Sequence, residues 1–286
     1  GVMKFIPKHL DENERSVILN KNTEKPFSGK YNDFYGKGTY ICKQCGLPLF
    51  KSEDKLSSGC GWPSFDDEIP SAIERKPEKD GRTEITCSFC GAHLGHVFEG
   101  ENFTPKNMRH CVNSISLDFI KAGNETVLKR ALFAGGCFWG VEHLFKDIEG
   151  VLQTKVGYSG GSLKNPSYDE VCSGSTGHVE AVLIVYDSTR ISYEELVKIF
   201  FEIHDFTQLN RQGPDFGEQY TSVVFCFDRG QMETALKITG ELKKAGYDVK
   251  TELKEALNFF PAEEYHQNYY EKTGKKPYCH YRRKIF

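Results

Sequence analysis

The ten cysteines of this chain show two kinds of spacing, and each kind predicts its own chemistry. Two Cys-x-x-Cys-Gly motifs begin at Cys42 and Cys87. Two residues between cysteines let both sulfurs face one ion, and the glycine that follows permits the positive φ of the turn. A thioredoxin-like redox pair is the alternative, but it would be expected once, between a strand and a helix. We therefore predict a structural zinc site that joins two distant hairpins through Cys42, Cys45, Cys87 and Cys90.

Two further cysteines of the first half lie in segments typical of reactive thiols. Cys111 lies in RHCVNSISL, just before an expected strand, where the neighbouring Arg109 and His110 would favour its thiolate. Cys60 lies in SGCGWPSF, a loop rich in glycine and proline that can move. A lone cysteine is more often a small buried residue, so these segments need support from other side chains.

That support comes from one aromatic residue and two histidines. Trp62 offers an aromatic wall two positions after Cys60, and His93 and His96 in GAHLGHVF offer titratable donors. Histidines three apart could also bind a metal, but the four thiolates already fill one zinc shell. These neighbours favour reactive thiols over buried ones.

The second half contains another reactive motif, GGCFWG, where an expected strand runs into a helix. Cys137 would lie at the amino terminus of that helix, where the helix dipole and free N–H groups favour a thiolate. A buried structural cysteine is the alternative, but it needs no Gly-Gly before it. Phe138 and Trp139 are either core residues or a cradle for a methyl group. Four polar residues from two later motifs would form a site only if the fold brings them together, namely Tyr168, Glu180, Asp215 and Tyr220.

The first half resembles the type B peptide methionine sulfoxide reductases. The resemblance is carried by SGCGWPSF, CGAHLGHVF and RHCVNSISL together with both zinc motifs, and it covers almost the whole half. It implies that Cys111 is the nucleophile and that Cys60 resolves the sulfenic acid. It also implies a set of residues that bind the sulfoxide and assist proton delivery. These are Trp62, His93, His96, Arg109 and Asn113.

The second half resembles the type A peptide methionine sulfoxide reductases through GGCFWG, EVCSGSTGHVEAV and EQY. The resemblance implies that Cys137 is the nucleophile and Glu180 the proton donor. It also implies that Tyr168, Asp215 and Tyr220 hold the sulfoxide oxygen. In PYCHY, Cys279 takes the usual position of a carboxy-terminal resolving cysteine. The remaining residues of interest are Phe216, where a histidine is common, Cys226, which we expect in the core, and Cys172, which has no assigned role.

Together these resemblances imply a bifunctional reductase of free or peptidyl methionine sulfoxide. The N-terminal domain would reduce the R epimer and the C-terminal domain the S epimer. Thiolate attack and protonation of the oxygen release methionine and leave a sulfenic acid, which a second cysteine converts to a disulfide. The carboxyl of Glu180 needs a raised pKa for this role, and Trp139 is expected to provide apolar surroundings. Thioredoxin is the implied reductant, zinc the implied metal, and no organic cofactor is expected.

Two other functions remain compatible with parts of the sequence. A zinc-binding thiol redox sensor without turnover would explain the ten cysteines but not the tyrosine, glutamate and aspartate motifs. A cysteine hydrolase would share a nucleophile and a histidine, but no histidine accompanies Cys137 in a plausible base role.

Length and charge exclude several classes of protein. A chain of 286 residues favours two domains, and 37 basic against 40 acidic residues leave no basic excess for nucleic acid. The longest wholly apolar stretch, 181–186, is far shorter than the ~20 residues that cross a bilayer, so we expect a soluble protein without a membrane partner. Gly1 and Val2 before Met3 read as an expression scar. We expect a cytoplasmic location, and a removed export signal would also fit this start.

The elements that must position these residues differ between the halves. Residues 1–120 are expected to form a mainly β domain with antiparallel sheets, zinc and one early helix over 9–19. The polar segment 121–129 is the expected linker, with the boundary near Gly123. Residues 130–286 are expected to form an α+β sandwich around a ferredoxin-like β-α-β-β-α-β core. The expected strands are 39–42, 82–87, 114–119, 129–133, 151–158, 178–186, 221–227 and 249–255, and the later helices start near 141, 192 and 231.

Overall fold

A computed structural model describes residues 8–286, and the chain divides into two compact units. The first unit extends to Leu128 and the second begins at Lys129. The predicted linker over 121–129 and the domain limits beside it stay predictions. The expected start at Gly1 lies outside the described residues. Within residues 8–286, no helix is both long enough and apolar enough to span a bilayer.

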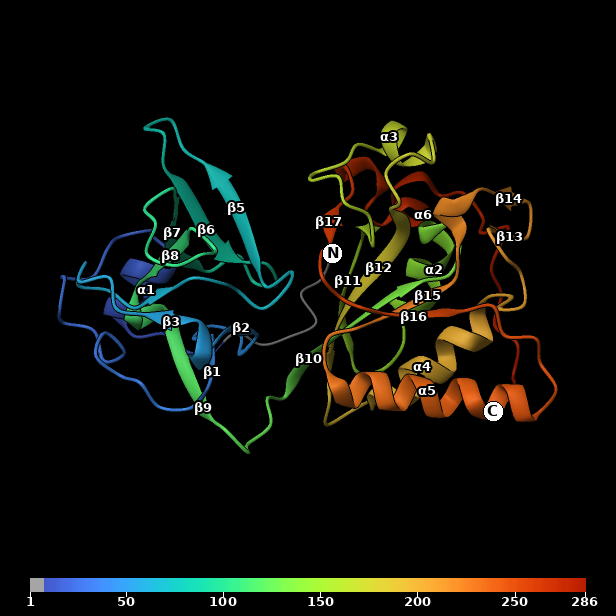
Figure 1. Cartoon of the computed structure of the whole chain (residues 1–286), viewed down its shortest axis with the longest axis horizontal. Helices are drawn as coiled ribbons and strands as arrows, with labels where there is room; N and C mark the ends of the chain where they lie inside the picture. Colours follow the sequence, from blue (N-terminus) through green and yellow to red (C-terminus); the bar gives the residue numbers. More distant parts are fainter. Residues whose placement is uncertain (1–7) are drawn as a thin grey trace. The chain divides into compact units, whose positions relative to one another are not determined.

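Two β-sheets contain the strands of the first unit, which is drawn in blue to green in Figure 1. One sheet has the strand order β2-β1-β9 and the other the order β3-β4-β8-β7-β6-β5. The mainly β character predicted for this half is confirmed. The strands are β1 (Gly38–Cys42), β2 (Pro48–Lys51), β3 (Lys55–Leu56), β4 (Ser64–Phe65), β5 (Ile73–Pro77), β6 (Thr83–Cys87), β7 (His93–Glu99), β8 (Met108–Val112) and β9 (Leu117–Lys121).

The early helix α1 (Glu12–Ile18) is shorter than the predicted range 9–19. It begins at residue 12 because Asp11 caps it. The Asp11 carboxylate accepts a hydrogen bond from the Glu14 N–H at 2.8 Å, and the Glu14 carboxylate accepts one from the Asp11 N–H at 2.9 Å. Val17 and Ile18 on the last turn are buried. The helix therefore contributes to the core of the first unit.

Two predictions around Cys111 are wrong. The expected strand over 114–119 begins only at Leu117, because Ser114–Ser116 form a short 3-10 helix, η2, ahead of β9. Cys111 was expected before a strand but lies inside β8. A central strand fixes the neighbours of its sulfur from both sides, which a loop would not do.

The second unit contains a six-stranded sheet in the order β16-β15-β10-β12-β11-β17 and a small β13-β14 pair. The sequence predicted the main strands and helices here to within a few residues. The ferredoxin-like topology stays a prediction at this point. The strands are β10 (Leu128–Ala134), β11 (Val151–Ser159), β12 (Val179–Asp187), β13 (Arg211–Gln212), β14 (Asp215–Phe216), β15 (Val223–Cys226), β16 (Glu252–Glu255) and β17 (Phe260–Pro261). The helices are α2 (Phe138–Phe145), α3 (Tyr168–Cys172), α4 (Tyr193–Ile203), α5 (Arg229–Lys244) and α6 (Tyr269–Thr273).

The larger core of the second unit lies between this sheet and its helices. Phe133 of β10 belongs to the larger cluster, whereas its neighbours Leu132 and Ala134 point to a smaller cluster on the other face. The Phe133 ring stacks on Phe145 of α2 and on Phe200 of α4, with centroids 5.5 Å and 4.8 Å away. Helices α2 and α4 therefore cover the same face, and α5 packs beside α4 in Figure 1.

Candidate active sites and a four-cysteine cluster

The two Cys-x-x-Cys-Gly motifs come together in the first unit. Cys42 ends β1 in the β1–β2 hairpin, and Cys87 ends β6 in the β6–β7 hairpin. The ligand atoms of Cys42, Cys45, Cys87 and Cys90 all lie within 4.8 Å of one another. Cys42 Sγ lies 3.6 Å from Cys90 Sγ, and Cys45 Sγ lies 3.7 Å from Cys87 Sγ. Sulfurs at the corners of a tetrahedron with ~2.3 Å bonds to zinc would be about 3.8 Å apart, so the cluster fits this ion.

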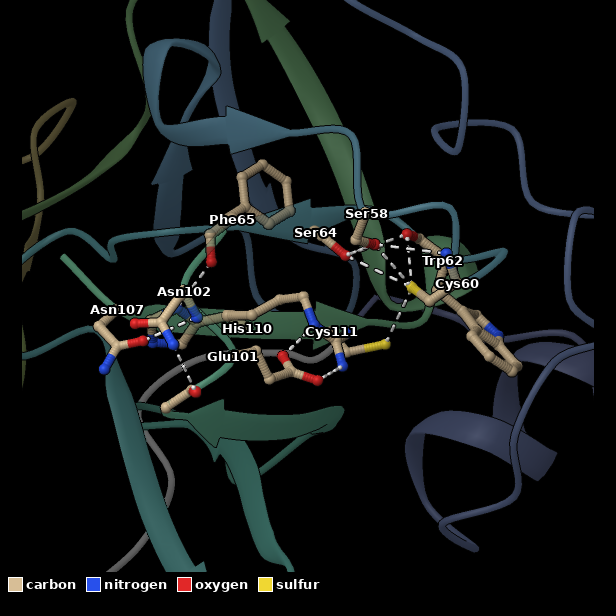
Figure 2. Close-up of polar contacts among 12 residues, drawn as sticks. Ser58, Cys60, Trp62, Ser64, Phe65, Glu101, Asn102, Asn107, His110 and Cys111 are labelled. Atoms are coloured by element: carbon tan, nitrogen blue, oxygen red, sulfur yellow. Dashed lines mark hydrogen bonds and ion pairs between the residues drawn. The ribbon is translucent and has the colours of Figure 1, made fainter. Parts of the chain in front are cut away.

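A second pair of cysteines, Cys60 and Cys111, forms a separate site in the same unit. Cys60 lies in the loop before β4, and its Sγ is 3.8 Å from the Sγ of Cys111. Figure 2 shows both sulfurs facing each other, with Ser58 and Ser64 on the far side of Cys60. The Ser58 hydroxyl donates to Cys60 Sγ at 3.0 Å, and Ser64 Oγ lies 3.5 Å from it. Little movement is needed to join the two sulfurs.

The strand register places a row of polar side chains on both sides of Cys111. His96 of β7 and Ser64 of β4 are its direct partners on the neighbouring strands, and Glu84 of β6 is the partner of His96. Directly paired residues in antiparallel strands project from the same face of the sheet. Glu84, His96, Cys111 and Ser64 therefore line one face.

An irregularity in β7 brings His93 to the same neighbourhood as His96. Residues three apart on a regular strand point to opposite faces, but the pairing of β6 with β7 shifts between Ile85 and Thr86. The two imidazole rings are 5.8 Å apart between centroids. His93 Nδ1 lies 2.7 Å from a Glu84 carboxylate oxygen, and His96 Nε2 lies 2.9 Å from one of Glu78. Burial lowers the pKa of His93, and the Glu84 carboxylate opposes that effect.

Arg109 is the cation next to Cys111 on the same strand face. Its guanidinium donates to both Glu101 oxygens, at 2.6 Å and 3.0 Å, and packs 4.6 Å over the Phe98 ring. The Nη1 atom is buried without a hydrogen-bond partner among the described residues. Arg109 acts to lower the pKa of Cys111, as the sequence predicted. It thus places an N–H donor beside the sulfur.

The contact between the thiols of Cys60 and Cys111 shifts their pKa values in opposite directions. A hydrogen bond with Cys60 is the main cause that raises the pKa of Cys111, followed by burial, and both outweigh Arg109. The hydrogen bond from the Cys111 thiol lowers the pKa of Cys60 well below its ordinary value, with Ser58 and Ser64 acting in the same direction. These contacts therefore favour the thiolate on Cys60. The prediction that cationic neighbours favour a Cys111 thiolate omitted this partner.

The structure shows the contacts of three other predicted residues of the first unit. His110 is turned to the opposite face of β8, where its ring contacts Glu68 and the Phe65 carbonyl, so its expected effect on the Cys111 thiol is wrong. Asn113 is buried and hydrogen-bonds the Leu94 carbonyl and the Glu24 N–H, which leaves it holding the loops around the site. Trp62 stays beside Cys60 in Figure 2, and its indole N–H donates to the Glu24 carbonyl at 3.1 Å.

In the second unit, Cys137 is the amino-terminal cap of α2 and is buried. The Trp139 backbone N–H acts to lower the pKa of its thiol, as expected at a helix amino terminus. The hydrogen bond with Cys279 and burial act more strongly, so that the pKa of Cys137 is raised.

Glu180 is a buried acid beside Cys137. Along β12, Glu180 shares one face of the strand with Val182 and Ile184, which belong to the core under the helices. Its carboxyl therefore faces the start of α2. Only 2 % of its surface is exposed. Burial raises the pKa of Glu180 well above its ordinary value, and the charges of Cys137 and Asp215 add to this. A carboxyl in this setting keeps its proton to higher pH than an exposed glutamate does.

The other predicted polar residues of the second unit converge on the same place. Tyr220 ends the short 3-10 helix η3 (Glu218–Tyr220), and burial raises the pKa of its phenol, followed by the charges of Glu180, Asp215 and Cys137. Tyr168 starts α3, and burial likewise raises the pKa of its hydroxyl, with Cys172 and Glu180 adding to the effect. Cys172 itself is exposed. These mutual effects mean that the separate motifs meet, which the sequence alone left open.

Cys279 approaches Cys137 from the carboxy-terminal segment. The sulfurs of Cys137 and Cys279 and a carboxylate oxygen of Asp215 all lie within 4.8 Å of one another. His280 Nδ1 is 2.9 Å from Cys279 Sγ, while its Nε2 lies 2.7 Å from the Gly135 carbonyl oxygen. Gly140 makes room for this ring, because a Cβ there would come within 2.2 Å of His280 Nδ1. The glycines of GGCFWG therefore also allow the segment around His280 to pack against the start of α2.

Glu202 of α4 anchors the residues that follow Cys279. Its carboxylate accepts hydrogen bonds from Arg282 Nε at 2.8 Å and from the Ile285 and Phe286 N–H groups at 3.1 Å and 3.3 Å. The Glu202 carbonyl accepts one more from the Arg283 N–H at 2.8 Å. Cys279 thus lies in a segment that is bound on the side of its carboxyl end.

The aromatic residues after Cys137 have different surroundings. Phe138 is a fully buried core residue whose ring lies 5.9 Å from that of Tyr158. Trp139 stacks on Tyr269 with 3.6 Å between centroids, and its indole N–H donates to His266 Nδ1 at 3.0 Å. Phe216 is exposed under the Arg211 guanidinium, and Cys226 lies in the core as expected.

Sequence reasoning missed several charged residues that shape the two sites. Glu263 accepts hydrogen bonds from the Tyr158 hydroxyl at 2.8 Å and the Tyr168 N–H at 2.9 Å. His280 directly follows Cys279, and this adjacency was a usable signal. Isolated acids such as Glu84, Glu101 and Glu263 carry no spacing that would reveal them.

Comparison with known proteins gives a match for each unit. The sequence model of the family described as "Peptide methionine sulfoxide reductase" matches residues 129–286, and that of the "SelR domain" matches residues 10–121. The peptide methionine sulfoxide reductase MsrA of Nautilia profundicola is 52% identical over 154 residues, covering 54% of this chain and 89% of that protein. MsrA of Methanococcoides burtonii is 49% identical over 152 residues, covering 52% of this chain and 99% of that protein.

A solved structure supports the same likeness for the fold. The crystal structure of Mxr1 from Saccharomyces cerevisiae in reduced form has a TM-score of 0.52 and 36% sequence identity. The likeness covers 55% of this chain and 93% of the yeast chain.

Proposed function

This chain belongs to the peptide methionine sulfoxide reductase family and carries a SelR domain ahead of that region, and we propose that it reduces both epimers of methionine sulfoxide in separate sites. The first unit would act on the R epimer and the second on the S epimer. One observation carries the proposal most directly: the buried Glu180, whose pKa is raised well above its ordinary value, lies beside Cys137, and Cys279 provides a second thiol. A thiol, an acid and a further thiol are what the reduction of a sulfoxide needs.

In the second unit we assign attack on the sulfoxide sulfur to Cys137. Glu180 donates the proton to the oxygen, methionine leaves, and a sulfenic acid remains on Cys137. Tyr168, Tyr220 and Asp215 would hold the oxygen, which their mutual electrostatic effects support. Trp139, which stacks on Tyr269, would form the apolar wall for the methyl group, and the buried Phe138 would pack behind it.

In the first unit we assign the same attack to Cys111. His96 is its direct cross-strand neighbour and would assist proton delivery together with His93. The unpartnered Nη1 of Arg109 would donate to the sulfoxide oxygen, and Trp62 would provide the apolar wall. Asn113 would act on the substrate through the loops that it holds. Substrate binding must also shift the proton balance from Cys60 toward a Cys111 thiolate.

Recycling would use Cys60 in the first unit and Cys279 in the second. Each lies close enough to its nucleophile to condense with a sulfenic acid, with sulfurs 3.8 Å apart in one pair and within 4.8 Å in the other. Thioredoxin would then reduce the disulfide by thiol exchange. Cys279→Ser should leave one equivalent of methionine in a single turnover but stop steady-state turnover of the S epimer with thioredoxin. Normal steady-state rates would pass the resolving role to Cys172 or show that no resolving cysteine is needed.

Zinc would be held by Cys42, Cys45, Cys87 and Cys90, where it joins the β1–β2 and β6–β7 hairpins. An ion with four protein ligands would be structural and would take no part in the reaction.

For the fold of the second unit, we propose the ferredoxin-like core. Its support is the order β15-β10-β12-β11, in which strands four, one, three and two of the β-α-β-β-α-β unit are neighbours. We also propose domains over 1–120 and 130–286 with a linker at 121–129, since β9 ends at Lys121 and β10 starts at Leu128. A cytoplasmic location is proposed because an enzyme that needs a dithiol reductant suits a reducing compartment.

Assays with the pure epimers test the function. Cys111→Ser should abolish reduction of the R epimer alone, and Cys137→Ser that of the S epimer alone. Cys172→Ser is the matched control, because this exposed thiol has no proposed role. Loss of both activities in one folded variant would contradict separate sites. An absence of turnover with either epimer would favour the zinc-binding redox sensor.

A further inference from the structure

The reduced second unit contains a set of atoms that could bind a metal ion, apart from the four-cysteine cluster. Cys137 Sγ, Cys279 Sγ and an Asp215 carboxylate oxygen lie within 4.8 Å of one another. They come from the start of α2, from the carboxy-terminal segment and from β14. The four sulfurs of the four-cysteine cluster in the first unit likewise lie within 4.8 Å of one another. We propose that these three residues bind one thiophilic divalent cation, Zn²⁺, when both cysteines are reduced.

The carboxylate gives the first support for this site. Asp215 Oδ2 is buried and has no hydrogen-bond partner among the described residues. The other oxygen, Oδ1, accepts only a long hydrogen bond of 3.4 Å from the Tyr278 hydroxyl. A buried acceptor without a donor is costly, and a cation would satisfy it. This oxygen is therefore available as a ligand.

His280 gives the second support, as a positioning residue. Its Nε2 faces the Gly135 carbonyl oxygen at 2.7 Å, which places the ring proton on Nε2 and leaves a lone pair on Nδ1. That lone pair accepts a hydrogen bond from the Cys279 S–H group, with 2.9 Å between Nδ1 and Sγ. The contact orients the Cys279 thiol near Cys137 before the ion binds.

The donor set selects the class of ion. Two sulfurs with one carboxylate favour Zn²⁺ or Cd²⁺, because Mg²⁺ and Ca²⁺ require oxygen ligands. Three protein ligands leave the fourth tetrahedral position to water. Binding breaks the S–H bonds of Cys137 and Cys279, forms two metal–sulfur bonds and releases two protons to solvent.

The site would exist only in the reduced protein, because a disulfide between Cys137 and Cys279 removes both sulfur ligands. A bound ion would also occupy the place of the sulfoxide and inhibit reduction of the S epimer. This last consequence depends on the proposed function, whereas binding of the ion does not.

Zinc titration of the reduced full chain tests the proposal. The background is Cys111→Ser, so that the thiol pair of the first unit does not contribute, and the four-cysteine cluster is filled beforehand. We expect one further equivalent of Zn²⁺ and the release of two protons. The disulfide form should bind none of this second equivalent. Cobalt can replace zinc to report thiolate ligands through its absorption.

Variants identify the ligands. Cys137→Ser and Cys279→Ser should each lose the second equivalent, and His280→Gln should weaken it by about 10- to 100-fold. Cys172→Ser and Cys226→Ser are matched controls that should bind normally. The absence of a second equivalent in a folded, reduced chain overturns the proposal, as does its survival in Cys279→Ser. Zinc binding in a chain without reductase activity would reject the proposed function and keep this site.

Discussion

The backbone N–H of Phe138 donates a hydrogen bond to Oε2 of Glu180 at 3.0 Å. This bond ties the buried carboxyl to the residue that follows Cys137. The same N–H partly opposes the rise in the pKa of Glu180, but burial outweighs it. The start of α2 therefore holds the Glu180 carboxyl and the Cys137 thiol in one fixed relation.

Glu180→Gln should slow the single-turnover reduction of the S epimer by the ~10²- to 10⁴-fold typical of lost general acid catalysis. Because the acid works when protonated, the wild-type rate constant should fall as pH rises through the raised pKa of Glu180. The variant should lack this fall, and rapid-quench measurements across pH would show it. Glu142→Gln is the control, since Glu142 is also buried but bonds to Thr154 and the Asn268 N–H. An unchanged pH profile in Glu180→Gln would assign the proton to another group.

Glu142 itself should make the second unit less stable as pH rises. Burial raises the pKa of Glu142 to about 7, so the folded state prefers the protonated carboxyl. Its contribution is complete below the ordinary pKa of 4.5 and is lost as pH rises toward 7. The difference in unfolding free energy from Glu142→Gln should change by at most ~1.4 kcal/mol per pH unit in this window.

Urea unfolding at several pH values would measure this effect. Trp139 reports on the second unit when Trp62 is replaced by phenylalanine, because the chain has two tryptophans. If the difference in unfolding free energy between wild type and Glu142→Gln did not change with pH, Glu142 would have an ordinary pKa.

Cys87→Ser should remove zinc from the four-cysteine cluster and destabilise the first unit, because metal binding contributes folding free energy. The activity on the S epimer should persist. Elemental analysis after dialysis against a weak chelator measures the metal, with Cys172→Ser as the control. Full zinc content in Cys87→Ser would reject the assigned ligands.

Cys111→Ala should raise the pKa of Cys60 toward its ordinary value. The Cys111 thiol is the main hydrogen-bond donor that stabilises a Cys60 thiolate. Alkylation of Cys60 at increasing pH, followed by mass spectrometry, gives the titration curve. Cys60 should react at lower pH in the wild type than in the variant. Identical curves would mean that Ser58 and Ser64 suffice to lower the pKa.

The sequence predicted the local elements well where their signals are local. Ser192 and Glu195 form the expected capping box at the start of α4. The apolar run of β12 is buried throughout because that strand is central in its sheet. The Cys-x-x-Cys-Gly turns also formed as expected, with positive φ at Gly46 and Gly91. Short-range spacing determines all of these features.

What the sequence could not show depends on strand pairing. Whether His96 faces Cys111 depends on the register of β7 with β8, and His93 joins it only through an irregular pairing with β6. His110 points away from the sulfur because adjacent residues of β8 face opposite sides of the sheet. The proton balance between Cys60 and Cys111 likewise follows from a contact across 51 positions of the chain. Such contacts follow from the tertiary fold and leave no periodic pattern.

The attachment of the chain end to Glu202 has a thermodynamic consequence for recycling. Cys279 lies between α6, which ends at Thr273, and Arg282, which Glu202 binds. A thiol tethered on both sides has a high effective concentration toward Cys137, and this favours the closed disulfide. A more stable disulfide has a lower reduction potential and demands a stronger external reductant. We therefore expect Glu202, a carboxylate on a core helix, to lower the reduction potential of the proposed Cys137–Cys279 disulfide. Glu202→Gln should make this disulfide easier to reduce in equilibrium titrations with a dithiol buffer.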